Sequence, residues 1–232
     1  MTCTAFNAEH LRNIAPEHAH KIHIVYHGLD LEALATPPPL PGGDETRWLA
    51  VGRLVPKKGY DTLLRACSLL RDGGARFRLR ILGEGPEERT LRRLAAELKL
   101  EDHVQLVGRV QNTEVWEEIG RSHALVVPSV RDRRGDIDGI PNVIIEAMAM
   151  KRPVVGSDLS GIPEVVRPGE TGLLVQPGDS LELSDAMARI GDDLEAAAAM
   201  GAAGRRLVEE RFDVRKNIEE QIRLLARAGK VR

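Results

Sequence analysis

The chain has 232 residues, of which 42% are hydrophobic and 29% charged, so it is long enough to bury a sizeable core. Its formal net charge of −2 argues against general nucleic-acid binding, and the absence of any run of about eighteen apolar residues predicts no membrane-spanning helix. Two cysteines, Cys3 and Cys67, have no spacing typical of zinc ligands; we expect reduced thiols, which favours a cytoplasmic protein.

Residues 1–35, which precede a proline-rich segment, are too few to form a domain. We expect a strand at residues 2–5, a helix near residues 7–13 and a second strand at residues 22–26. Residues 36–43 have the sequence TPPPLPGG, whose four prolines fix φ and remove amide donors. Residues 36–45 are therefore predicted to be an extended connector, and residues 1–35 the remnant of a preceding domain with an interdomain strand.

Residues 46–212 alternate between short β-branched apolar runs and longer segments of helical period. Apolar residues recur at helical spacing over residues 60–70 and 91–98. This alternation predicts an α/β fold, with a Rossmann-like parallel sheet covered by helices on both faces and a ligand site beyond the carboxyl ends of the strands. The strands are expected at residues 47–51, 77–82, 103–107, 124–127, 153–156 and 172–175.

Residues 213–232 are predicted to form an amphipathic carboxy-terminal helix. Its apolar residues lie four, eight and eleven positions after the first one, at Val214, Ile218, Ile222 and Leu225. Two interpretations remain open: the stripe packs on its own domain, or it contacts a further domain or a partner protein.

A first chemical signature follows the predicted strand at residues 47–51, with the sequence GRLVPKKG over residues 52–59. Gly52 lets the backbone turn and approach a ligand, Arg53 offers a planar fork of donors, and Lys58 adds a point charge. A pyrophosphate group needs such cations. Alternatively, Arg53 and Lys58 are ordinary solvated charges at a helix entry.

A second signature follows the predicted strand at residues 124–127 and begins with Ser129. A long polar loop leads to Pro141, which opens a helix through Met150 whose free amides favour a phosphate. Asp138 and Glu146 flank this helix start, about 10 Å apart if the helical rise is about 1.5 Å per residue. They suit a ribose diol and the hydroxyls of a sugar, although a capping Asp and a surface Glu would give the same pattern.

In this order, the motifs resemble those of the donor-binding half of the retaining glycosyltransferases of family 4, over roughly residues 22–212. The resemblance rests on the following motifs: GR and KG at residues 52–53 and 58–59, LGEGP at 82–86, PS at 128–129, DGIP at 138–141, EAMA at 146–149, PVV at 153–155 and GIPE at 161–164. It implies the carboxy-terminal half of a two-domain GT-B fold, and a hexosyltransferase that needs neither a metal nor another cofactor.

The resemblance also implies roles for individual residues. Arg53 and Lys58 hold the diphosphate of a UDP or GDP sugar, and Asp138 joins them in the catalytic set. The donor-binding set comprises Gly52, Gly83 and Gly85 for close backbone approach, Arg109 and Val110 beside the base, Ser129 in the PS motif, Gly139 and Ile140 facing the sugar, and Glu146 on the ribose.

The sequence departs from the family pattern in three respects. Asp138 stands where family members usually have Glu, which shortens the reach by one methylene, and Pro141 removes an amide donor. The acceptor half is not among these residues. We therefore expect a donor-binding domain that is inactive alone, with an acceptor domain as partner in cis or in trans and any peripheral membrane association made through that domain.

Two alternative functions remain at this point. One is a non-catalytic module that binds a nucleotide sugar. The other is a related GT-B enzyme, such as a nucleotide-sugar epimerase or a glycan phosphorylase, which uses the same fold for different chemistry.

Overall fold

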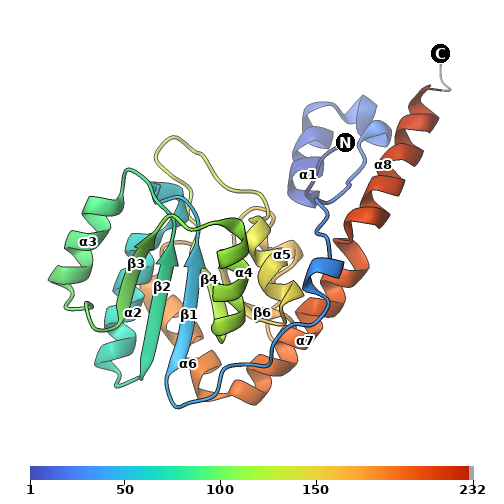
Figure 1. Cartoon of the computed structure of the whole chain (residues 1–232). Coiled ribbons are helices and arrows are strands. Elements are labelled where there is room, and N and C mark those ends of the chain that lie inside the picture. Colours follow the sequence, from blue (N-terminus) through green and yellow to red (C-terminus); the bar gives the residue numbers. More distant parts are fainter. Residues whose placement is uncertain (230–232) are drawn as a thin grey trace.

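The computed structural model describes residues 1–229 and places a six-stranded parallel sheet at the centre of that part of the chain (Figure 1). The strand order is β3-β2-β1-β4-β5-β6, and every neighbouring pair is parallel. All six strands predicted for residues 46–212 are confirmed to within one residue at each end. Their bounds are Thr46–Val51 (β1), Phe77–Leu82 (β2), Val104–Gly108 (β3), Ala124–Val127 (β4), Val154–Ser157 (β5) and Gly172–Val175 (β6).

Helices connect the strands and cover the two faces of the sheet (Figure 1). The chain moves outward from β1 to β3 and then returns to the other side of β1 at β4, so the strand order reverses between β1 and β4. In open parallel sheets such a reversal places a ligand crevice beyond the carboxyl ends of those strands. The helices are Tyr60–Asp72 (α2), Glu88–Glu97 (α3), Asn112–Arg121 (α4), Asn142–Ala149 (α5), Ser180–Asp192 (α6), Leu194–Arg211 (α7) and Val214–Gly229 (α8), with 3₁₀ turns at Pro56–Lys58 and Ile162–Glu164.

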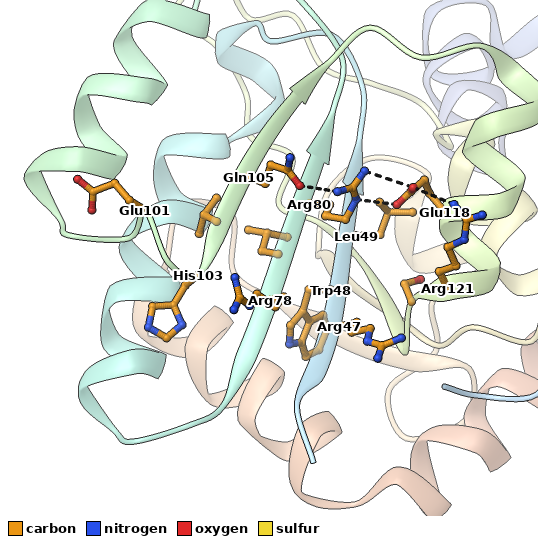
Figure 2. Close-up of a pocket in the computed structure, with 13 residues that line it drawn as sticks. Arg47, Trp48, Leu49, Arg78, Arg80, Glu101, His103, Gln105, Glu118 and Arg121 are labelled. Carbon is orange, nitrogen blue, oxygen red and sulfur yellow. Dashed lines mark hydrogen bonds and ion pairs between the residues drawn. The ribbon is translucent and has the colours of Figure 1, made fainter. Parts of the chain in front are cut away.

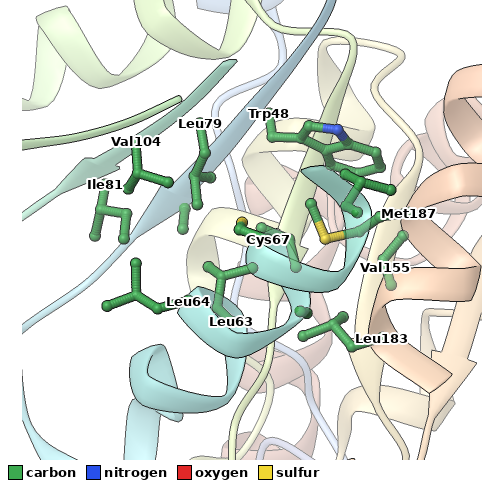
Figure 3. Close-up of a cluster of buried hydrophobic side chains, with 14 of the residues drawn as sticks. Trp48, Leu63, Leu64, Cys67, Leu79, Ile81, Val104, Val155, Leu183 and Met187 are labelled. Carbon is green, nitrogen blue, oxygen red and sulfur yellow. The ribbon is translucent and has the colours of Figure 1, made fainter. Parts of the chain in front are cut away.

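Two hydrophobic clusters hold the layers together, one on each face of the sheet. Successive residues of β1 point to opposite faces, because side chains alternate along a strand. Trp48 packs with Leu63 of α2 and Met187 of α6 in the first cluster (Figure 3), whereas Leu49 packs with residues of α5 and α7 in the second. Burial on both faces explains why β4 reads as a continuous apolar run.

The second face is covered only in part. Over β2 and β3 it carries Arg78, Arg80 and Gln105, which line an open groove of about 800 Å³ beside α4 (Figure 2). Arg80 donates to Gln105 and, from Nε, to Glu118 of α4 at 2.7 Å. Arg78 donates from Nε to Glu45, just before β1, at 3.0 Å.

Residues 1–35 differ from the prediction. The expected helix is present as α1 (Ala5–Ile14), and 3₁₀ turns follow at Pro16–Lys21 and Glu32–Leu34, but the predicted strands at residues 2–5 and 22–26 are wrong. Only isolated bridges form, between Thr2 and Ile24 and between Leu29 and Asp213, so the predicted interdomain strand is also absent from this segment. A strand needs neighbours to pair its backbone groups, and the backbone of residues 22–26 pairs with a neighbouring segment only at Thr2 among the described residues.

The connector at residues 36–45 is extended, and two buried side chains hold it against the sheet domain. Arg152 is only 1% exposed, and its guanidinium donates to the carbonyls of Pro38 and Pro39 and to those of Ile119, Gly120 and Met150. Burial lowers the pKa of Arg152 to about 10. The ring of His123 accepts the Arg47 amide proton at Nδ1 and lies 2.9 Å from the Pro41 carbonyl at Nε2, and its burial lowers the His123 pKa. A neutral ring with its proton on Nε2 meets both contacts.

Helix α8 extends away from the sheet domain (Figure 1). Ile218, Ile222 and Leu225 are 49%, 61% and 59% exposed, so the interpretation that this stripe packs on its own domain is wrong for these three residues. The start of the helix is fixed by two backbone hydrogen bonds. The Leu29 amide donates to the Phe212 carbonyl, and the Val214 amide donates to the Leu29 carbonyl. No helix among residues 1–229 is both long and apolar enough to span a membrane.

Candidate functional site

The two signatures of the sequence meet at the carboxyl ends of β1 and β4. Gly59 adopts a left-handed conformation, with φ of 64°, and a Cβ there would lie 1.9 Å from the carbonyl oxygen of Pro128. The amide of Val130 donates to the Lys57 carbonyl at 2.9 Å. A glycine at position 59 therefore lets the loop after β1 pack directly on the loop after β4.

Three further glycines bring the loop after β2 to the same place. Gly52 and Gly83 have φ of 154° and 138°, and a Cβ on Gly83 would lie 2.0 Å from the Gly52 oxygen. A Cβ on Gly85 would lie 2.4 Å from the Leu54 oxygen, and the Leu54 amide donates to Glu84 at 2.9 Å. The close approach at Gly83 and Gly85 is to the chain's own backbone, which is a different physical reason for glycine from approach to a nucleotide.

Four charged side chains join the loop after β1 to the loop after β4. Lys58 Nζ lies 2.7 Å from Asp138 Oδ2, and Lys57 Nζ lies 3.2 Å from Asp138 Oδ1. Lys57 Nζ also lies 3.0 Å from Asp136 Oδ2, and this hydrogen bond raises the Lys57 pKa against a lowering by burial. Arg53 is exposed and forms no ion pair within residues 1–229. Both cations of the predicted catalytic set thus lie at this edge, with Asp138 bound to one of them.

Helix α5 begins beside these charges. Its amino-terminal boundary is Pro141, and no side chain caps it. The Ile144 amide donates to the Pro141 carbonyl, whereas the amides of Asn142 and Val143 have no acceptor among the described residues and are free to meet an anion. Glu146 lies in the second turn and is half-buried. Burial raises the Glu146 pKa, and a side-chain hydrogen bond from Trp116 opposes that shift. The two oxygens of the carboxylate have the capacity to accept protons from hydroxyl groups.

Three other predicted donor-binding residues border the same edge. Ser129 is 1% exposed, and its Oγ has no hydrogen-bond partner among the described residues. Arg109 and Val110 line a shallow hollow of about 500 Å³ together with Gln111 and Glu114, and the guanidinium of Arg109 lies 3.6 Å from the Glu84 carboxylate. The expected base-binding residues therefore lie beside the loop after β2.

The amino-terminal segment covers the side of the site where Gly139 and Ile140 lie. A Cβ on Gly139 would lie 3.6 Å from Thr4 Cγ2, and one on Gly161 would lie 2.8 Å from Ile140 Cγ1. Glu164 accepts the Ala5 amide proton at 2.8 Å, which anchors the start of α1. Gly139 thus lies against Thr4, and Ile140 lies against Gly161, which also faces Thr4.

Sequence reasoning gave Glu164 and Tyr26 no role. Glu164 accepts from the Tyr26 hydroxyl at 2.9 Å, and the Arg211 guanidinium lies 4.6 Å above the Tyr26 ring. The GIPE motif contains Glu164, but its partners lie more than 100 residues earlier in the chain, so no local pattern indicates them. Within residues 1–229, no three His, Cys, Asp or Glu side chains gather closely enough to hold a metal ion.

Comparison with known families and proteins gives consistent results. Residues 37–207 match the family model for glycosyl transferases group 1. The amylovoran biosynthesis glycosyltransferase AmsK of Erwinia amylovora is 35% identical over 167 residues, which are 72% of this chain and 41% of AmsK. The GDP-mannose-dependent alpha-(1-6)-phosphatidylinositol monomannoside mannosyltransferase of Mycobacterium tuberculosis is 36% identical over 170 residues, which are 72% of this chain and 43% of that enzyme. The matched segments span less than half the length of these curated relatives.

Solved structures show the same fold. Sucrose-phosphate synthase from Thermosynechococcus elongatus superposes with a TM-score of 0.81 at 26% identity, over all of this chain and 58% of that one. HepE from Anabaena, solved in complex with UDP and glucose, gives a TM-score of 0.82 at 20% identity, over 97% of this chain and 62% of HepE. The sheet domain has the Rossmann-like fold found in GT-B glycosyltransferases.

Proposed function

This chain belongs to the glycosyl transferases group 1, and on that premise we propose that it is the carboxy-terminal, donor-binding half of a retaining family 4 enzyme. Such an enzyme transfers a hexose from a nucleoside diphosphate to an acceptor hydroxyl. One observation carries the proposal: Lys58, the uncapped start of α5 and the half-buried carboxylate of Glu146 converge where the strand order reverses. UDP and GDP are the proposed nucleotides, since HepE was solved with UDP and the mycobacterial relative uses GDP-mannose.

In this proposal each group acts on a different part of the donor. The diphosphate leaves with negative charge, which Arg53, Lys58 and the first amides of α5 stabilise. Two side-chain cations and a helix start suffice for that neutralisation, so we propose that no metal is required. Glu146 accepts from the ribose hydroxyls, Arg109 and Val110 border the base, and Asp138, Gly139 and Ile140 face the sugar.

We also propose that transfer needs an acceptor half in cis or in trans. The matched segments span less than half of the relatives' length, which supports this. A transfer reaction needs an acceptor hydroxyl in near-attack geometry and a site closed to water, and the sheet domain offers the donor edge alone.

Incubating the chain with labelled UDP and GDP sugars is expected to give binding and at most slow hydrolysis of the donor. The measurement is product analysis with a mixture of acceptors, before and after addition of a separately produced acceptor domain. Rapid transfer by the chain alone would contradict the proposed division of labour, and failure to bind any of these donors would contradict donor binding.

Glu146→Gln is expected to weaken ribonucleotide binding by about 1 to 2 kcal/mol, because a neutral amide is a poorer acceptor for two hydroxyl donors than a carboxylate. The measurement is calorimetry with UDP or GDP and with the corresponding 2′,3′-dideoxynucleotide. The dideoxynucleotide should bind both proteins equally, and Glu170→Gln, an exposed carboxylate paired with Arg167, is the matched control. Equal binding of both nucleotides by the wild type would show that Glu146 has no ribose role.

A further inference from the structure

The loop after β1 contains two adjacent lysines, and only Lys58 has a role in the proposed donor site. Lys57 nonetheless has the larger set of ionic contacts, since its Nζ lies 3.0 Å from Asp136 and 3.2 Å from Asp138. Among residues 1–229, Lys58 Nζ forms an ion pair with Asp138 alone, at 2.7 Å. The four side chains form a continuous row of alternating charge: Asp136, Lys57, Asp138 and Lys58.

This row is electrically neutral, which creates a problem for an incoming anion. A diphosphate that binds Lys58 must compete with the Asp138 carboxylate, which already neutralises that ammonium group. Asp138 is 17% exposed and Lys58 16%, so solvent screens this pair less than an exposed one. Unless another cation holds Asp138, the carboxylate both retains Lys58 and repels the phosphate.

The two lysines face different parts of the site. Lys58 runs past the β1 edge, since a Cβ on Gly52 would lie 3.1 Å from Lys58 Cε. Lys57 is held on the other side of Asp138, because its carbonyl accepts from the Val130 amide and its ammonium group reaches Asp136. Its contacts are therefore with the loop after β4 that carries the acidic residues.

We propose that Lys57 is a positioning residue that retains Asp138 when a diphosphate takes over Lys58. The contact with Asp136 directs the Lys57 ammonium group at the loop that carries Asp138, so the carboxylate stays on Lys57 and does not approach the phosphate when Lys58 is released. This inference rests on the proposed donor site. It assigns Lys57 an effect on nucleotide affinity that operates only through Asp138.

The test is a double-mutant cycle that combines Lys57→Met with Asp138→Asn. Calorimetry at low ionic strength measures the affinity for UDP, GDP and inorganic pyrophosphate, the last of which needs no base recognition. Lys57→Met is expected to weaken binding roughly tenfold when Asp138 is present and less than about twofold when it is Asn, a coupling of the size found between contacting charges. Arg133→Met is the control. It removes the same charge from an exposed position of the loop after β4 and should leave the affinity for the three ligands nearly unchanged.

Each outcome discriminates. An equal loss in both Asp138 backgrounds would mean that Lys57 binds the phosphate directly, and no loss in either would mean that it has no part in binding; both results overturn the inference. Urea unfolding of each variant detects a merely structural role, which would lower stability in both backgrounds alike. If the wild type binds none of the three probes, the proposed donor site itself fails, whereas binding by the wild type with no coupling rejects only the role of Lys57.

Discussion

Replacing Arg152 by Ala is expected to lower the free energy of unfolding by about 3 to 5 kcal/mol. The guanidinium donates to five buried or half-buried carbonyls, two of them in the connector, and truncation leaves these acceptors unpaired beside a cavity. The connector would lose its attachment to α4 and to the end of α5. Urea denaturation followed by circular dichroism measures the change.

Two further variants separate the causes of this loss. Arg152→Met fills most of the volume without donating, so it should recover only the part of the loss caused by the cavity. Arg152→Lys keeps the charge but lacks the planar guanidinium that reaches the carbonyls of both the connector and α4. Its free energy of unfolding should also remain well below that of the wild type. Arg121→Ala, at an exposed arginine paired with Glu117 and Glu118, is the control and should cost less than about 1 kcal/mol. A similarly small cost for Arg152→Ala would show that the hydrogen bonds of the Arg152 guanidinium contribute little to the free energy of unfolding.

The second large effect is expected in nucleotide binding. Arg53→Ala and Lys58→Ala should each weaken UDP or GDP binding by about 1.5 to 3 kcal/mol, as expected for charge-assisted hydrogen bonds to phosphate. Lys58→Ala also leaves Asp138 with Lys57 as its sole cationic partner among the residues described, which adds repulsion toward the ligand. Calorimetric titration of each variant provides the measurement.

Arg189→Ala, an exposed arginine on α6, is the matched control and should bind like the wild type. Wild-type affinity in both Arg53→Ala and Lys58→Ala would contradict binding of the diphosphate at the carboxyl edge of the sheet. A loss in Lys58→Ala alone would leave Arg53 as a solvated charge, the alternative that the sequence pattern left open.

Strand β4 was predictable from the sequence because it is buried on both faces, whereas β2 alternates buried apolar residues with Arg78 and Arg80. Runs such as residues 124–127 read as continuous apolar segments, and this local signal survives in the folded protein. The strand predicted at residues 22–26 failed for the opposite reason. Its sequence, IHIVY, is rich in β-branched residues, but a strand also needs paired neighbours, and the local sequence does not contain that information.

The candidate site was predictable to the extent that its groups follow strands. Gly52, Lys58 and Ser129 each come soon after a strand, so parallel topology brings them to one edge. The pairing of Asp138 with both lysines and the anchoring of α1 by Glu164 join residues that are about 80 and 160 positions apart in sequence. Such contacts depend on how loops pack, which strand and helix periodicity do not specify. The role of Arg152 was missed for the same reason, since its acceptors are backbone carbonyls with no sequence signature.

The most direct test of the account is amide hydrogen exchange of the chain with and without saturating UDP or GDP. Protection is expected in the loops after β1, β2 and β4 and in the first turns of α5, that is, over residues 52–59, 83–87 and 129–146. Residues 78–80 and 103–105, which line the open groove on the sheet, should exchange unchanged (Figure 2). Protection confined to that groove, or no protection by either nucleotide, would contradict the assignment of a nucleotide-sugar site to the carboxyl edge of the sheet.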